Sequence, residues 1–280
     1  MTPRSQAVLF MGGGALMLVL NDTAAKWLLA RYDPIQIAFA RSLLALPIIA
    51  VIIWMTGGGF RSHRWSIHAF RGVLILLATL AFFASLRSLS LAEGTALLFT
   101  APIIVAVLAA VFLNERVDAR RWVSVGMGFI GVLIILRPGM VAFRPESLQA
   151  LLAALLYACI MLSARWIDPR DGLWTMTFHM TLFSALFGAV SLPGEWPLLR
   201  ASDLGLFAFM AVLGTGGAAF VSQAFRLAPA SFVAPLDYTA LIWASLLGWL
   251  VWGSVPGWPV YAGAVVIIAS GVLLLRSRQS

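Results

Sequence analysis

Long apolar runs, separated by short polar, glycine or proline clusters, recur along the whole chain. About 20 apolar residues in a row cross a bilayer as an α-helix. The pattern predicts ten such helices, at 7–29, 34–55, 68–87, 91–113, 120–137, 147–166, 173–192, 203–225, 230–252 and 258–275. The connections between them are too short to form a soluble domain.

The composition agrees with a membrane protein. Of the 280 residues, 61% are hydrophobic and 11% are charged, whereas about a quarter of an ordinary soluble domain is charged. The net charge of +8 does not indicate nucleic-acid binding, because the basic residues lie between apolar runs, where the positive-inside rule accounts for them. The only cysteine, Cys159, leaves no internal disulfide, and we expect no metal and no cofactor. We predict an all-α integral membrane protein of the bacterial inner membrane.

The basic residues also predict the orientation of the chain. If the N-terminus lies in the cytoplasm, 12 of the 19 basic residues fall on the inner side. Because cytoplasmic loops are enriched in Lys and Arg, we expect both termini in the cytoplasm. A signal peptide is the alternative reading of the first run, with Arg4 before it and Thr23-Ala24-Ala25 near its end, but cleavage would leave nine helices.

The chain has the marks of an internal duplication. The stretches Ser90–Ile103 and Arg226–Leu241 are weakly similar, and the two halves end in IILR and LLLR. Ten helices divide near residue 140 into five and five, and an odd number per half gives the halves opposite orientations. We therefore predict two inverted five-helix repeats, 1–139 and 140–280. Secondary transporters have this architecture and bind solutes near the membrane midplane between the repeats.

Prolines and glycines interrupt some of the predicted helices. Pro102 and Pro235 lie in the corresponding fourth helices of the two halves, and paired interruptions are typical of transport sites. Gly214, Gly216 and Gly217 fall within four residues, which predicts either close helix packing or a hinge. We expect kinks at the two prolines and a hinge at the three glycines.

Charged residues gather in the second half of the first predicted helix, in the stretch LVLNDTAAKW. Asp22 and Lys26 are one turn apart on the same face, and Arg41 lies at a similar depth in the second helix. An unpaired charge at this depth is costly, so we expect Asp22 to pair with Arg41 between neighbouring helices. Asn21, Asp22, Lys26 and Arg41 are candidate solute-binding residues, and a fixed ion pair that joins two helices is the structural alternative.

Polar residues in the second half extend this candidate site. Asp237 and Tyr238 follow Pro235 in the ninth predicted helix, and an intramembrane carboxylate in a transporter is by default a substrate or proton site. Pairing of Asp237 with Gln223 or Arg226 is the alternative, and Gln223 is itself a candidate solute-binding residue.

Thr100 and Tyr157 complete the candidate solute-binding residues. The hydroxyl of a threonine such as Thr100 commonly bonds the backbone of its own helix. We expect His179, alone in the seventh predicted helix, to be a hydrogen-bonded structural histidine.

Three stretches resemble a known family. They are NDTAAKWL (Asn21–Leu28), QIAFAR (Gln36–Arg41) and TAPIIVAVLAAVFLNERV (Thr100–Val117). With the ten-helix plan they resemble the EamA family of the drug/metabolite transporter superfamily over nearly the whole chain, and NDTAAKWL with FAR is similar to the subgroup of S-adenosylmethionine and riboflavin carriers. The second half departs from the family pattern at Gly253-Ser254, where a Gly-Glu is common.

The sequence favours a secondary transporter over other classes of membrane protein. An intramembrane enzyme would need a motif such as GxSxG, HExxH or a phosphate-binding loop, and the sequence contains none. A channel or a structural membrane protein is the remaining alternative from another class.

Charges of both signs favour a zwitterionic solute, derived from an amino acid or similar to S-adenosylmethionine, with a proton or a counter-solute as coupling partner. An exporter of aromatic or cationic metabolites or drugs, and a riboflavin-type uptake carrier, stay open, as do the direction of transport and the oligomeric state.

Overall fold

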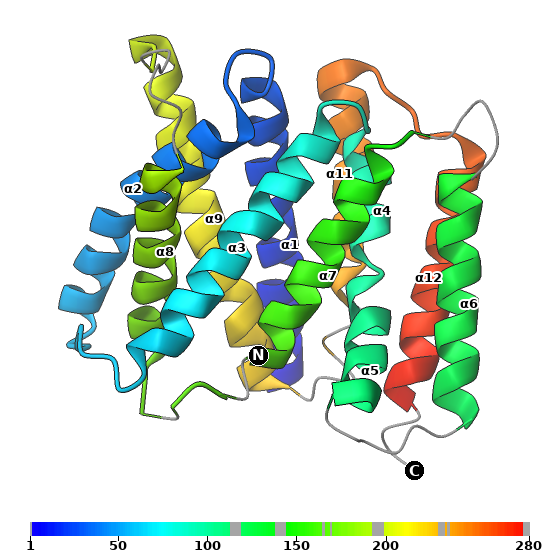
Figure 1. Ribbon diagram of the computed structural model, residues 1–280, viewed down its shortest axis with the longest axis horizontal. Helices are drawn as coiled ribbons and strands as arrows, with labels where there is room; N and C mark the ends of the chain where they lie inside the picture. The colour runs from blue at the N-terminus through cyan, green and yellow to red at the C-terminus, as the bar shows by residue number, and fades with distance from the viewer. Residues whose placement is uncertain are drawn as a thin grey trace.

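The computed structural model describes residues 2–112, 119–137, 144–163, 166–168, 170–191, 199–228, 233 and 236–276. The regular elements of this part of the chain are α-helices (Figure 1). They are α1 (Pro3–Leu28), α2 (Pro34–Met55), α3 (Trp65–Leu86), α4 (Leu91–Leu98), α5 (Ala101–Phe112), α6 (Ala119–Leu136), α7 (Ser147–Ser163), α8 (Leu173–Val190), α9 (Ala201–Leu227), α11 (Thr239–Trp252) and α12 (Trp258–Arg276). The all-α prediction is confirmed.

Five helical segments in the described part of the chain are long and apolar enough to cross a membrane by themselves: α1, α2, α3, α8 and the segment Ala201–Ala224 of α9. Further apolar helices are shorter. Large apolar side chains cover much of the outer surface, and Trp54 and Val190 are 80% and 87% exposed. Such a surface fits lipid, because contiguous exposed apolar area of this kind is rare on soluble monomers.

The fourth and ninth predicted spans, 91–113 and 230–252, are not single helices. In the first half, α4 ends at Leu98 and α5 begins at Ala101, so the helix is interrupted at Phe99 and Thr100. In the second half, α11 begins at Thr239. The interruption expected near Pro102 is therefore present, whereas Pro235 lies outside the described residues. Broken helices at membrane depth are tolerated where the freed backbone is enclosed by protein.

Most long helices pack against a helix of the other half. The main pairs are α1 with α9, α2 with α8, α3 with α7, and α6 with α12 (Figure 1). Glycines bring the backbones together at two of these pairs. A Cβ on Gly14 would lie 3.1 Å from the carbonyl oxygen of Gly217, and a Cβ on Gly131 would lie 2.8 Å from that of Gly263. Close approach through small residues is the usual way in which membrane helices associate.

One expectation about neighbouring helices is wrong. The first two helices, α1 and α2, make at most a marginal contact with each other, whereas α9 packs against both of them. A helix from the second half therefore separates two consecutive helices of the first.

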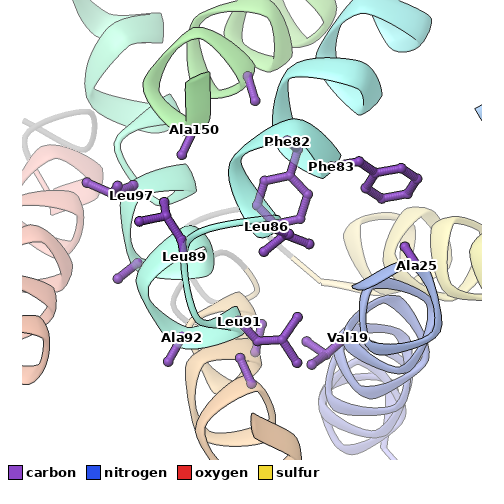
Figure 2. Close-up of a cluster of buried hydrophobic side chains, with 14 of the residues drawn as sticks. Val19, Ala25, Phe82, Phe83, Leu86, Leu89, Leu91, Ala92, Leu97 and Ala150 are labelled. Atoms are coloured by element: carbon purple, nitrogen blue, oxygen red, sulfur yellow. The ribbon is translucent and has the colours of Figure 1, made fainter. Parts of the chain in front are cut away.

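A buried apolar cluster holds the centre of the bundle together. Figure 2 shows Val19 of α1, Phe83 and Leu86 of α3, Leu97 of α4 and Ala150 of α7 in one group. The same cluster extends to residues of α2, α5, α6, α9, α11 and α12, so it joins both halves of the chain.

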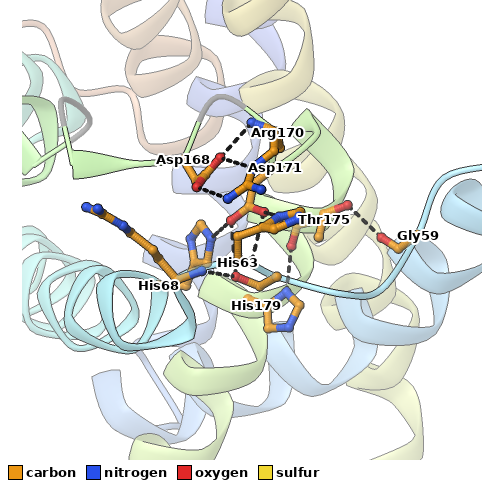
Figure 3. A network of polar contacts seen from close by, with 10 residues as sticks. Gly59, His63, His68, Asp168, Arg170, Asp171, Thr175 and His179 are labelled. Atoms are coloured by element: carbon orange, nitrogen blue, oxygen red, sulfur yellow. Dashed lines mark hydrogen bonds and ion pairs between the residues drawn. The ribbon is translucent and has the colours of Figure 1, made fainter.

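A polar cluster around Asp171, in the loop before α8, ties that loop to the α2–α3 connection (Figure 3). The carboxylate accepts hydrogen bonds from the backbone N–H of His63 at 3.0 Å, the ring of His63 at 2.7 Å, the ring of His68 at 2.8 Å and the hydroxyl of Ser62 at 3.1 Å. The side chains of Asp171 and His68 are completely buried. This cluster fixes the ends of α2, α3 and α8 relative to one another.

The hydrogen bonds determine the acidity of Asp171. Burial alone would raise the pKa of this carboxyl, but the hydrogen bonds from His68, His63 and Ser62 outweigh burial and hold the pKa well below its ordinary value of 3.8. A carboxyl whose pKa is depressed in the folded state stabilises the fold above its unfolded pKa, and the contribution is lost as the pH falls toward the folded pKa.

We expect Asp171→Asn to lower the thermal stability of the protein in detergent, by about 2–4 kcal/mol, because a buried carboxylate with several charge-assisted hydrogen bonds becomes a neutral amide. The unfolding temperature at neutral pH measures this loss, and the difference from wild type should narrow below about pH 4. Asp168→Asn is the matched control, since Asp168 bonds only the exposed Arg170 two residues away. Equal stability of Asp171→Asn and Asp168→Asn would contradict the role given to the cluster.

Candidate functional site

Asn21 of α1 and Arg41 of α2 approach each other at Gly214 of α9, and Asp22 follows Asn21 on α1. Asp22 accepts a hydrogen bond from the Asn21 amide at 3.0 Å. Asp22 and Arg41 interact electrostatically, but the two described side chains form no direct ion pair. Among the described residues, Asn21 Oδ1 and Arg41 Nε are buried with no hydrogen-bond partner. The carboxylate of Asp22 and the guanidinium group of Arg41 are therefore close enough to interact but do not form an ion pair.

Gly214 of α9 provides the space in which the side chains of Asn21 and Arg41 lie. A Cβ at this position would lie 3.0 Å from Arg41 Nη1 and 3.2 Å from Asn21 Oδ1. The absent side chain leaves room for both polar groups beside the α9 backbone. The expected Asp22–Arg41 ion pair is thus corrected to a longer-range interaction, because α9 and not α2 is the direct neighbour of α1.

Gly216 and Gly217 lie at other contacts of the same helix. A Cβ on Gly216 would lie 2.5 Å from the methyl group of Met17, and one on Gly217 would lie 2.9 Å from Leu18 Cγ. Helix α9 runs continuously from Ala201 to Leu227 through all three glycines, so this structure shows them in close packing rather than at a bend.

Lys26 does not join Asp22 and Arg41, although it is one turn from Asp22. Its ammonium group donates hydrogen bonds to the carbonyl oxygen of Leu86, at 2.6 Å, and to that of Leu89. Leu86 is the last residue of α3 and Leu89 lies in the connection that follows, so Lys26 holds α1 to the end of α3 and to the α3–α4 connection. The predicted cluster of three charges is therefore divided in two.

The surroundings of Lys26 form a separate cavity of about 430 Å³ near the start of α4. Glu93, Arg144 and Trp252 line it with Lys26, and the Lys26 ammonium lies 5.7 Å from the centre of the Trp252 ring. Glu93 caps α4 in a capping box with Ser90 and lies 3.9 Å from Arg144. The Glu93 carboxylate therefore already has partners within the protein.

A second polar group lies where the interruptions of the two halves meet. Asp237 interacts electrostatically with the hydroxyls of Tyr157 and Tyr238. The rings of Tyr238 and Phe99 pack edge to face with centroids 4.9 Å apart. Because Phe99 lies at the α4–α5 interruption and Tyr238 immediately precedes α11, the structure brings the two interruptions into contact, with the Asp237 carboxylate beside them.

Thr100 and His179 each form a hydrogen bond to a backbone carbonyl nearby in the sequence. Thr100 donates to the carbonyl oxygen of Leu97 at 2.8 Å, and the His179 ring bonds the Thr175 carbonyl at 2.9 Å, so both make the expected bonds within their own part of the chain.

Gln223 lies half-buried on α9 and makes no polar contact with Asp237 within the described part of the chain. The side chains of Arg226, Pro102 and Pro235 lie outside the described residues.

Sequence reasoning missed one buried cation, Arg71. It counts as an inner-loop arginine if the third helix begins at residue 68, but α3 begins at Trp65, and Arg71 is 5% exposed. Its Nη1 atom donates to the carbonyl oxygen of Ile160 at 2.6 Å and to the Ser163 hydroxyl at 2.9 Å. The sequence signal for a buried cation was the position of Arg71 inside an apolar run. The count of basic residues treated Arg71 as a marker of orientation instead.

The arrangement suits reversible binding of a charged solute. Among the described residues, no group of three or more His, Cys, Asp or Glu is placed to hold a metal ion. Charges held apart at membrane depth instead offer partners for a molecule that carries complementary charges.

Comparison with known proteins assigns the family. The model of the EamA-like transporter family matches residues 5–137 and 145–276. The chain is 25% identical to the S-adenosylmethionine uptake transporter of Rickettsia prowazekii over 264 residues, which cover 93% of this chain and 89% of that protein.

It is also 27% identical to the riboflavin transporter of Vibrio cholerae over 271 residues, which cover 95% and 91% of the two chains. A crystal structure that is 18% identical in sequence superposes with a TM-score of 0.59, covering 99% of this chain and 100% of that one; at this identity it supports the fold alone.

These matches agree with the helical bundle, the lipid-facing apolar surface and the charged side chains inside it. The chain belongs to the EamA-like transporter family and is a multi-pass membrane transporter.

Proposed function

We propose that this chain is a secondary transporter that moves a small zwitterionic metabolite across the plasma membrane by alternating access. The observation that carries the proposal is the pair Asp22 and Arg41, which interact electrostatically beside Gly214 of α9 without forming an ion pair. A solute with a cationic and an anionic group supplies the partner that each side chain lacks. S-adenosylmethionine, which one relative is named for transporting, carries charges of both signs.

The pattern of helix packing supports two inverted repeats. If the first five helices correspond to the last five, α1 corresponds to α7 and α3 to α9. The pair α1–α9 then becomes α7–α3, and both pairs are among the main contacts. The same exchange turns α2–α9 into α8–α3, which is also present. The match of one family model to residues 5–137 and again to 145–276 agrees with this division.

Asp237 is the proposed coupling group. It lies beside two phenol hydroxyls at the contact between the interruptions of the two halves. The two halves of an inverted-repeat carrier move against each other around such a place. A carboxylate there changes its surroundings during the cycle and can exchange a proton or meet a cationic group. The prolines 102 and 235 are the proposed points of adjustment.

An aromatic solute is the second candidate. Tyr157 and Tyr238 interact with Asp237, and the Phe99 ring packs against Tyr238. Aromatic rings stack favourably on other rings. A riboflavin transporter is among the relatives. Uptake of riboflavin without uptake of amino-acid derivatives would favour this candidate.

We expect both termini to lie in the cytoplasm. Helices α1 and α12 have their chain ends at the same end of the bundle (Figure 1), and the Arg/Lys distribution favours that end as the cytoplasmic one. Reporter fusions after Arg137 and after Ser280 should give an external and a cytoplasmic signal respectively. Signals on the same side would contradict the five-plus-five inverted arrangement.

We expect Asp22→Asn to reduce uptake of the zwitterionic solute about 10- to 100-fold, because one charge-assisted contact is worth about 1.5–3 kcal/mol. Uptake per folded molecule in proteoliposomes, with amino acids and S-adenosylmethionine as labelled solutes, measures the effect.

Asp203→Asn is the matched control for this variant. Asp203 is also near a helix end but is held by Tyr32 at 2.8 Å and Arg31 at 3.2 Å, so its loss should change stability and not specific uptake. Full uptake by the exchanged variant, Asp22→Arg with Arg41→Asp, would show that the two charges only hold helices together.

We expect Asp237→Asn to fold in detergent but to lose transport driven by a proton gradient, because the amide stays neutral. Solute counterflow separates two roles: it survives if Asp237 carries only protons and fails if Asp237 binds the solute. Asp33→Asn, at an exposed ion pair with Arg87, is the control. Wild-type uptake and pH dependence in Asp237→Asn would place the coupling group elsewhere.

A further inference from the structure

A cavity of about 240 Å³ lies between α2, α3, α8 and α9. Two arginines line it, Arg41 from α2 and Arg71 from α3. One water molecule occupies about 30 Å³ in the liquid, so the cavity has room for about eight waters, or for a small organic molecule with a similar number of non-hydrogen atoms. It is smaller than the pockets of drug-sized ligands.

The charge of this cavity is not balanced by the residues around it. None of the described residues that line it is acidic. Within the described part of the chain, Arg71 bonds only neutral groups, the Ile160 carbonyl and the Ser163 hydroxyl, and Asp22 acts on Arg41 without forming an ion pair. Two guanidinium groups buried in one cavity are costly without an anion.

Each arginine also has one covered nitrogen that the described part of the protein leaves unsatisfied, which adds to the cost of burying the two charges. The Nε atoms of Arg41 and Arg71 are buried with no hydrogen-bond partner among the described residues. Serine and threonine hydroxyls face the same space, among them Ser42, Thr181 and Thr215. A guanidinium group binds a carboxylate through two parallel N–H···O bonds, so the donors match an oxyanion and not a cation.

We propose that the cavity between Arg41 and Arg71 holds the carboxylate of the transported solute, with Arg71 as a binding residue that the sequence pattern does not single out. The inference rests on the proposed transport of a zwitterion and deepens it: the anionic end lies in this cavity, and the cationic end lies toward Asp22. Arg41 borders both places, because its Nη1 atom faces Gly214 beside Asn21.

The test measures binding by the purified full chain, through ligand-dependent shifts of the unfolding temperature. Methionine carries both charges, N-acetylmethionine keeps only the carboxylate, and methioninamide keeps only the ammonium group. We expect methionine and N-acetylmethionine to stabilise the wild-type protein in a saturable manner. Methioninamide should bind about tenfold more weakly than methionine, since it lacks the group that the arginines hold.

Arg71→Gln distinguishes this cavity from other sites. We expect its affinity for N-acetylmethionine to fall about tenfold or more and its affinity for methioninamide to stay unchanged. Arg170→Gln is the control, because Arg170 is an exposed loop arginine paired with Asp168, and it should bind all three ligands as wild type does. Unchanged binding of N-acetylmethionine by Arg71→Gln, or equal loss of all three ligands, would overturn the proposal.

A second variant, Arg71→Lys, and a measurement with inorganic phosphate complete the test. If Arg71→Gln does not fold, Arg71→Lys keeps the charge but loses the planar fork, and it should bind N-acetylmethionine more weakly with methioninamide unchanged; wild-type binding of both overturns the assignment. Stabilisation of the wild type by inorganic phosphate at equal ionic strength, without stabilisation by N-acetylmethionine, would also overturn the carboxylate assignment.

The binding assay and the uptake assays fail independently. Carboxylate binding that depends on Arg71, in a protein that transports no solute, would overturn secondary transport alone. Zwitterion uptake with an unchanged preference for acids over amides in Arg71→Gln would overturn the carboxylate site alone.

Discussion

The contact between α9 and α1 is the constraint on which the arrangement of the candidate site depends. Gly14 and Gly217 bring the two backbones so close that a Cβ on either glycine would lie 3.1 Å from the carbonyl oxygen of the other. In lipid, helices gain little from burying apolar surface against each other, so close packing of small residues determines which helices pair. Helix α9 packs against both α1 and α2, which make at most a marginal contact with each other, and the described side chains of Asp22 and Arg41 form no direct ion pair.

The buried charges of the protein fall into two groups with different physical states. Lys26 donates to two backbone carbonyls, and Asp171 accepts from two histidines and a serine. These charges are satisfied within the described part of the chain and hold its elements together. Arg41 and Arg71, in contrast, keep buried donors without partners. Unsatisfied polar groups of this kind reduce stability, and an anion in the proposed cavity would offset part of the cost of burying the two arginines.

The sequence predicts much of the fold because the signal for membrane helices is local. Apolar runs long enough to span a bilayer recover α2 at 34–55 and nearly all other helices to within a few residues. The α4–α5 interruption is marked by Pro102, whose missing N–H and ring disfavour the helix interior. The break itself falls at Phe99 and Thr100, which carry no strong local signal, so an uninterrupted span is the simplest expectation from hydropathy.

The candidate site is less predictable, because it depends on which helices are neighbours. The depths of Asp22 and Arg41 follow from counting residues along their helices, but the packing of α9 against both helices follows only from the tertiary structure. Likewise, Lys26 shares a face with Asp22 yet reaches the α3–α4 connection instead. Arg71 was missed because an arginine near a helix end serves equally well as an orientation signal or as a buried group.

The Asp171 cluster and the arginine cavity involve the same helices. Asp171 joins the α2–α3 connection to the start of α8, and α2, α3 and α8 supply three of the four walls of the cavity. The fourth wall is α9, whose glycines make its closest contacts with α1. Hydrogen bonds therefore hold three walls together, while close packing holds the fourth wall to a different partner. A change in the shape of the cavity thus requires least disruption if α9 and α1 move as one unit against α2, α3 and α8, since neither the buried carboxylate nor the glycine contacts then have to break.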